Sequence, residues 1–245
     1  MKKTSKIVAV VLAALLVVAA VAVLAACGEP EHAAYGLVHN KGYVGKATVK
    51  MSDGKVVEAT LDEACFPTQV KPSAEEVEAN ADFVVAGYWK TVKWANVTAV
   101  YNEEAKSYLV GEQKLVEFFA TEANCEAYFE AVAANKVTVV TAAGDKTDIL
   151  NAASLLKSQN GYWSGDKIRA GQIGWKANVE ATVNYVKANG FGGFADGLVN
   201  GDLNRTSGVE GDLSDQVVDS NGVKTGATWT DFLDYFYLLK TASTR

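Results

Sequence analysis

The chain has 245 residues, of which 49% are hydrophobic, and its 29 acidic side chains outnumber 23 basic ones. This length predicts one large domain or two small ones. An acidic chain without a basic patch is a poor candidate for nucleic-acid binding, because neutralising phosphates takes clustered lysine and arginine. Two histidines offer little material for Ser-His-Asp or Cys-His catalysis, which counts against hydrolase chemistry.

The N-terminus has the order of a targeting segment. Three lysines at positions 2, 3 and 6 precede an unbroken apolar run from Ile7 to Ala26, and small residues then lead into Cys27. This order resembles the signal peptide and lipobox of bacterial lipoproteins. It implies cleavage before Cys27 and a lipid on that residue, although an apolar run of this length can also span a bilayer as a retained helix.

Processing at Cys27 divides the chain into three parts. We expect a signal peptide over 1–26, a lipidated tether over 27–34 and a folded region over 35–245, as one domain or as subdomains 35–156 and 157–245. The mature chain keeps 20 basic and 29 acidic side chains, a net charge of −9, because the removed segment carries three lysines and no acids. Cys27 would then hold the protein to the lipid bilayer of the cell membrane, on its extracytoplasmic face.

The first predicted element is a β-hairpin. Residues alternate in polarity from Tyr43 to Met51, Ser52-Asp53-Gly54-Lys55 forms a turn, and Val57, Ala59 and Leu61 resume the alternation. A Pro-containing loop at 64–69 follows, and then a brief helix that opens with a capping box at Ser73.

Further strands and helices alternate through the middle of the chain. Strand-like runs at Phe83–Trp89, Thr91–Tyr101 and Ser107–Phe118 would extend the antiparallel sheet of the hairpin. We expect a helix capped by Thr121, a β-branched strand at Val137–Thr141 and a short helix near 151–156. The pattern predicts an α+β fold, with a twisted antiparallel sheet and packed helices.

Two cysteines remain after Cys27. An extracytoplasmic location permits a disulfide between Cys65 and Cys125, and two small buried apolar residues are the alternative. Neither their spacing nor that of Asp212, Asp215 and Asp219 fits a metal site, so no metal is expected.

The C-terminal third combines loops with one long helix. The loop at 158–165 carries Tyr162 and Trp163, which either fold back onto the core or face a flat ligand. Apolar residues recur at helical spacing from Trp175, and Asn189-Gly190 ends that helix. The Gly- and Asp-rich stretch 191–213 lacks periodicity and is typical of a functional loop.

Lys224-Thr225-Gly226-Ala227-Thr228 is a tight turn that leads into an apolar-periodic run. We expect Thr228 or Thr230 to cap the following helix. A helix N-terminus attracts anions through its unpaired N–H groups, and Gly226 and Ala227 leave room for a phosphate to approach. A capped structural helix without a ligand is the alternative.

Thr225-Gly226-Ala227-Thr228 resembles the Ser/Thr-Gly-Ala-Thr motif of the FMN-binding domain family. These are extracytoplasmic redox proteins in which a flavin transferase esterifies the last threonine of the motif to FMN phosphate. The start of the hairpin, Gly42-Tyr43-Val44-Gly45 followed by an Asp-Gly-Lys turn, also resembles these domains. Family members carry an acid six residues before that threonine, where this chain has Gly222, and its nearest acid is Asp219.

The resemblance implies an FMN cofactor, held covalently at Thr228 or non-covalently. It places the backbone of Thr225, Gly226 and Ala227 around the phosphate, with Trp229 and Thr230 at the helix start. Tyr162, Trp163 or Trp229 would stack on the flavin ring. We expect an electron carrier that meets a flavin transferase and membrane or extracellular redox partners. The alternative is a lipoprotein with no redox role that binds a peptide, a sugar or another small molecule on a related fold.

Overall fold

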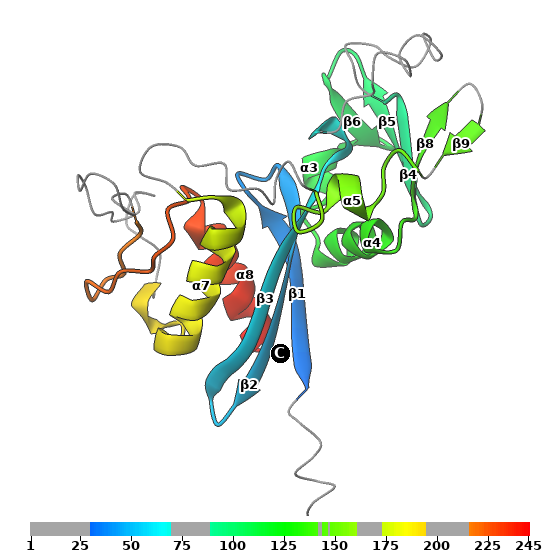
Figure 1. Cartoon of the computed structure of the whole chain (residues 1–245). Coiled ribbons are helices and arrows are strands. Elements are labelled where there is room, and N and C mark those ends of the chain that lie inside the picture. Colours follow the sequence, from blue (N-terminus) through cyan, green and yellow to red (C-terminus); the bar gives the residue numbers. More distant parts are fainter. Residues whose placement is uncertain (1–29, 70–88, 142–143, 147, 161–172, 195–215) are drawn as a thin grey trace, which may run out of the picture. The chain divides into compact units, whose positions relative to one another are not determined.

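Two antiparallel sheets with packed helices make up the fold of this computed structural model (Figure 1). The predicted α+β class is therefore confirmed, but the strands form two sheets where the sequence predicted one. The structure describes residues 30–69, 89–141, 144–146, 148–160, 173–194 and 216–245. The predicted signal peptide, Cys27 and most of the predicted tether lie outside these ranges.

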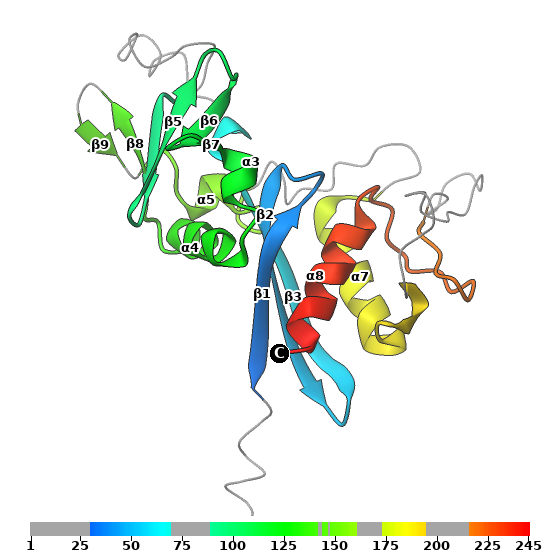
Figure 2. The same cartoon turned by 180° about the vertical axis from the view of Figure 1, so that it is seen from behind.

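The first sheet has three strands in the order β1-β2-β3, which Figure 2 shows from behind. Strands β2 (Tyr43–Ser52) and β3 (Lys55–Cys65) form the predicted hairpin, with Ser52 opposite Lys55 at the turn and Tyr43 opposite Cys65. Strand β1 (Glu31–Val38) was not predicted. The tether assigned to 27–34 is too long, because Ala34 is already buried in this strand.

The second sheet has six strands in the order β7-β6-β5-β4-β8-β9. The run predicted as one strand at 91–101 is two, β4 (Thr91–Trp94) and β5 (Val97–Asn102), because the backbone turns at Ala95 with a φ of 46°. The run at 107–118 divides into β6 (Ser107–Val110), β7 (Gln113–Lys114) and helix α3 (Leu115–Phe118). Strand β8 (Val137–Thr141) is as predicted and pairs with β9 (Gly144–Lys146).

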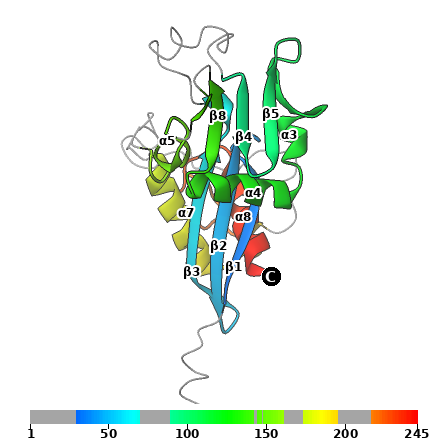
Figure 3. The same cartoon turned by 90° about the vertical axis from the view of Figure 1, so that its right-hand side faces the viewer.

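Helix α4 (Glu122–Ala133) contacts strands of both sheets, β2 and β3 as well as β4 and β8 (Figure 3). Its Tyr128 hydroxyl donates to the carbonyl of Cys65 at the end of β3, 2.6 Å away. The ring of Tyr128 also meets Trp94 of β4, with ring centroids 5.0 Å apart. The sheets are therefore separate but share one aromatic core.

The helix predicted from Ser73 and the strand at 83–88 lie outside the described residues.

Helices α7 (Trp175–Asn189) and α8 (Phe232–Ser243) contact each other and pack on β3 and β2 of the first sheet (Figure 1). The long helix α7 and its end at Gly190 confirm the prediction. The described residues also contain the short helices η1 (Pro67–Gln69), α5 (Ala152–Leu155) and η2 (Gly192–Phe194). Helix α8 begins later than predicted, after Asp231, so neither Thr228 nor Thr230 is its N-cap.

Cys65 and Cys125 are free thiols, and both are buried. Of the two predicted alternatives, a disulfide and two small buried apolar residues, the structure therefore has the second. The Cys125 thiol donates to the carbonyl of Phe119 within its own part of the core. Burial raises the pKa of both thiols to about 12. Both side chains therefore act as small apolar groups and not as thiolates.

Candidate functional site

Thr225 to Ala227 belong to the second arm of a narrow hairpin over residues 217–227, whose tip lies at 219–223. The Val217 N–H donates to the Ala227 carbonyl at 2.7 Å, and the Thr225 N–H donates to the Val217 carbonyl at 2.9 Å. Gly226 has a φ of 78°, a left-handed conformation that glycine adopts without strain. The chain therefore bends at Gly226, where the sequence predicted a tight turn, but the residues on either side of it pair with Val217.

Four consecutive N–H groups of this turn donate to side-chain oxygens. Gly226 donates to Gln216 Oε1 at 3.1 Å, and Ala227 donates to Thr225 Oγ1 at 3.1 Å. Thr228 and Trp229 both donate to Asn178 Oδ1, at 2.6 Å and 3.2 Å. Successive backbone donors can bind anionic oxygens in proteins, but here side chains of the protein itself accept all four.

Thr228 lies against the N-terminal end of α7. Its side chain is fully buried, at 0% exposure. Its Oγ1 accepts the N–H of Ile173 at 3.0 Å and lies 3.4 Å from Asn178 Oδ1. A reaction at this hydroxyl therefore requires the turn and the start of α7 to separate.

Asn178 of α7 joins the turn to the start of its own helix. While its Oδ1 accepts from the turn, its Nδ2 donates to the carbonyls of Ile173 and Gly174, at 2.9 and 3.1 Å. An amide side chain has both a donor and an acceptor end, and this one is buried with both ends used. Asn178 was not predicted as a site residue, because nothing in the helical spacing distinguishes it from a solvated polar residue.

Asp219 fixes the hairpin that precedes the turn. Its Oδ1 accepts the N–H groups of Asn221 and Val223, each at 2.8 Å, and its Oδ2 accepts the Tyr185 hydroxyl at 2.6 Å. Burial opposes its ionisation, but these hydrogen bonds outweigh burial and lower the pKa of Asp219. Asp219 therefore holds the hairpin together. The Gly- and Asp-rich stretch before it in the sequence would instead suggest a solvated charge on a loop.

Replacing Gly193 with alanine is expected to destabilise this hairpin. A Cβ at Gly193 would collide with both the Tyr185 hydroxyl and Asp219 Oδ2, which are hydrogen-bonded to each other. We expect the free energy of unfolding to fall by about 1–3 kcal/mol, as for other overpacked sites. Chemical denaturation measures the loss. Gly192→Ala is the matched control, because a Cβ there meets no atom within 4 Å, and equal losses in the two variants would contradict this account.

The remaining predicted site residues divide into three groups. Trp229 is buried and its ring stacks on Tyr235 of α8, with centroids 3.8 Å apart and planes 3° apart. Thr230 is exposed. Tyr162 and Trp163 lie outside the described residues, so their placement stays a prediction. One face of the Trp229 ring is therefore already covered by a side chain of the protein itself.

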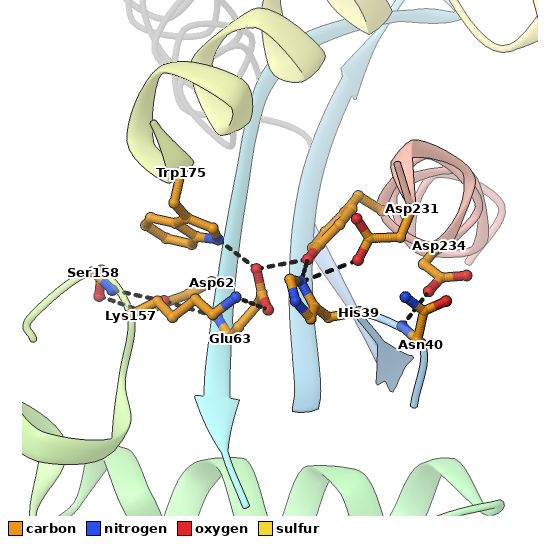
Figure 4. Close-up of polar contacts among 10 residues, drawn as sticks. His39, Asn40, Asp62, Glu63, Lys157, Ser158, Trp175, Asp231 and Asp234 are labelled. Atoms are coloured by element: carbon orange, nitrogen blue, oxygen red, sulfur yellow. Dashed lines mark hydrogen bonds and ion pairs between the residues drawn. The ribbon is translucent and has the colours of Figure 1, made fainter. Parts of the chain in front are cut away.

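A buried polar cluster lies beside this aromatic stack, and we call Glu63, Lys157, Trp175 and Tyr235 the Glu63 cluster (Figure 4). Glu63 Oε2 pairs with Lys157 Nζ at 2.7 Å, and the two residues are 1% and 2% exposed. Glu63 Oε1 accepts the indole N–H of Trp175, the first residue of α7, and the Tyr235 hydroxyl at 2.8 Å. The carboxylate therefore connects β3 with α7, α8 and the segment after α5.

The sequence analysis missed this cluster, although one signal for it exists. Ala59 and Leu61 point inward on β3, and continuing the alternation places Glu63 and Cys65 on the same face. A glutamate at an inward strand position needs a buried partner. Which lysine supplies that partner does not follow from the sequence, because Lys157 is far away along the chain.

The cluster continues to the surface through His39. His39 Nδ1 lies 3.3 Å from the Tyr235 hydroxyl and 3.0 Å from Asp231 Oδ2. Figure 4 shows His39 between Asp231 and Glu63. The His39 side chain is 46% exposed, whereas that of Asp231 is 5% exposed. Burial opposes ionisation of Asp231, but the hydrogen bond and the charge of His39 outweigh it and lower the pKa of Asp231.

Comparison of the chain with family models, with curated proteins and with solved structures found no match. Within the described ranges, no group of three or more His, Cys, Asp or Glu side chains is placed to hold a metal ion. None of the helices in that part of the chain combines the length and the apolar character that a membrane span needs.

Proposed function

We propose that the protein is an extracytoplasmic FMN-binding lipoprotein that carries electrons at the cell membrane. The observation that carries the proposal is the segment Thr225–Thr228, where a sequence similar to a flavin attachment motif has four consecutive backbone donors, which a phosphate would take over from Gln216, Thr225 and Asn178. Such a row of donors suits a phosphate group. The left-handed Gly226 and the small Ala227 keep large side chains away from the same backbone.

The residues of the turn have separate roles in this proposal. Thr228 would carry the phosphoester through Oγ1, and the N–H groups of Gly226 to Trp229 would bind the phosphate oxygens that are not esterified. Bound FMN would supply the redox chemistry. The protein would supply position and a low-polarity surrounding, in which the Trp229–Tyr235 stack is the nearest described aromatic surface along the chain.

The membrane anchor is part of the same proposal. Lipid on Cys27 would hold the folded region close to membrane or extracellular redox partners, and a flavin transferase would act on Thr228 after export. Intact mass of the full chain recovered from membranes is the direct test of the anchor. We expect a chain that begins at Cys27 and carries added acyl mass, with both features lost in a Cys27→Ser variant, whereas a wild-type chain of full, unmodified mass would favour a retained helix.

The experiment that tests FMN attachment combines intact mass and visible absorbance. We would express the full chain with a flavin transferase and a supply of flavin adenine dinucleotide, from which AMP leaves as the FMN phosphate is esterified, next to Thr228→Ala and Thr230→Ala variants. We expect flavin absorbance and the mass of one FMN less one water, both lost in Thr228→Ala. The matched control Thr230→Ala should keep both, because Thr230 is an exposed threonine outside the turn.

Two other outcomes have distinct meanings. Flavin absorbance without added mass would show that the protein holds FMN non-covalently. A folded, colourless and unmodified protein would contradict the redox proposal and leave the second candidate, a ligand-binding lipoprotein. That candidate is favoured by Gly222 at the position where the family has an acid and by the full burial of Thr228.

A further inference from the structure

Thr228 is closed against the start of α7 by two contacts. Its Oγ1 accepts the N–H of Ile173 at 3.0 Å, and its own N–H donates to Asn178 Oδ1 at 2.6 Å. Its side chain is fully buried. The hydroxyl therefore meets an external reactant only after this part of the chain has separated from α7.

Asn178 is held in place by its own helix. Its Nδ2 donates to the carbonyls of Ile173 and Gly174, and its backbone carbonyl accepts the Thr182 hydroxyl at 2.8 Å. Helix α7 packs on β3, whereas none of the described residues 216–231 belongs to a helix or to a strand of either sheet. When the two separate, the segment with Thr228 therefore moves and Asn178 stays with α7.

The hairpin over residues 217–227 is held to α7 at both of its ends. At the tip, Asp219 Oδ2 accepts the Tyr185 hydroxyl at 2.6 Å. At the other end, Asn178 Oδ1 accepts the N–H of Thr228. Asn178 and Tyr185 lie about two helical turns apart, roughly 10 Å along the axis of α7. The Thr228 end can therefore leave the helix while Tyr185 still holds the tip.

We propose that Asn178 is a positioning residue that keeps Thr228 closed in the chain without flavin, and that its release is the first step of flavin attachment. After release, the N–H groups of Thr228 and Trp229 can donate to phosphate oxygens. Thr228 Oγ1 then forms the bond to phosphorus, the pyrophosphate bond of flavin adenine dinucleotide breaks, AMP leaves and the hydroxyl proton passes to solvent. The attachment step rests on the proposed function, whereas the closing contact belongs to the chain without a cofactor.

Hydrogen exchange on the full-length chain made without flavin tests the closing contact. We expect the protection of residues 225–230, relative to α4, to fall roughly tenfold in Asn178→Ala, because two buried N–H groups lose their acceptor. Tyr185→Phe is the matched comparison, since it removes the hydrogen bond at the tip. It should lower the protection of residues 219–223 more than that of 225–230. Equal losses in α4 and in residues 225–230 of Asn178→Ala would contradict a local release.

The rate of flavin attachment tests the positioning role. Folded chain purified without flavin would be mixed with a flavin transferase and flavin adenine dinucleotide, and intact mass would follow the reaction. We expect Asn178→Ala to react roughly tenfold faster than the wild type, in proportion to its larger open fraction. Asn178→Asp keeps an acceptor for the two N–H groups and adds a negative charge that repels the phosphate, so it should react more slowly than the wild type. Asn184→Ala changes an exposed residue of the same helix and should keep the wild-type rate.

The opposite signs separate positioning from general stability. Both Asn178 variants lose the donor to the carbonyls of Ile173 and Gly174, so a purely structural role predicts rate changes in the same direction for both. Such a result, or an Asn178→Ala rate no higher than that of the wild type, overturns the proposal. If no chain takes up flavin, the proposed function fails together with the attachment step. The exchange of residues 225–230 then still decides whether Asn178 closes the segment.

Discussion

Replacing Lys157 with methionine is expected to lower the free energy of unfolding by about 3–5 kcal/mol, the usual cost of removing one partner from a buried ion pair. The Glu63 carboxylate is 1% exposed and would lose the Lys157 ammonium group 2.7 Å away. Methionine retains most of the apolar volume that lies over the Tyr43 ring, where Lys157 Nζ is now 4.1 Å from the centroid. The loss therefore comes mainly from the unpaired charge, and urea denaturation monitored by circular dichroism measures it.

Two further variants separate charge from packing in this experiment. The double variant Lys157→Met/Glu63→Gln should recover most of the stability, because glutamine keeps an oxygen that accepts from Trp175 and Tyr235 without a buried charge. Lys46→Met is the surface control, since Lys46 pairs with Glu130 at the same 2.7 Å with side chains 27% and 47% exposed. We expect this control to cost at most about 1 kcal/mol. A similar loss from both single lysine variants would show that burial of the Glu63 pair has no special cost.

Replacing Asn178 with alanine is the second change with a large expected effect. It removes the acceptor for the N–H groups of Thr228 and Trp229 and the donor for the carbonyls of Ile173 and Gly174. Buried groups left without partners cost about 1–3 kcal/mol each unless water reaches them. We expect a loss of about 2–4 kcal/mol in the free energy of unfolding, and faster hydrogen exchange at residues 226–230 than in α4.

Asn184→Ala is the matched control for Asn178, because both residues lie on α7 but Asn184 is exposed. It should change stability by less than about 0.5 kcal/mol, in the range of ordinary surface substitutions. Asn178→Asp tests the two ends of the side chain, since it keeps the acceptor and loses the donor. If Asn178→Ala unfolds at the same denaturant concentration as Asn184→Ala, the amide does not hold the turn against α7.

Periodicity predicted the elements whose register is local. The alternation on both sides of Asp53-Gly54 specified the β2–β3 hairpin, and the helical spacing from Trp175 to Gly190 specified α7. Periodicity failed where short elements meet. The chain turns at Ala95, within an apolar run that looks continuous in the sequence. Ala95 has a left-handed backbone conformation, which an alanine in the sequence does not predict.

The candidate site was predicted only in part for a related reason. A short motif with a glycine at its centre specified the bend at Gly226, because a left-handed φ is a local backbone preference of glycine. The partners that surround it, Asn178 and Ile173 at the start of α7, come from a segment about 50 residues away. No local pattern encodes such a contact.

The sequence by itself determined the α+β class, the hairpin, the long helix and a glycine-centred bend at Gly226, since each depends on residue types at fixed short spacings. Only the tertiary structure decided that the strands form two sheets, that Thr228 is buried against α7, and that Glu63, Lys157, Tyr235, His39 and Asp231 meet. Buried charges find their partners when distant segments pack together. The total energy of the fold selects that packing, and local residue spacing does not predict it.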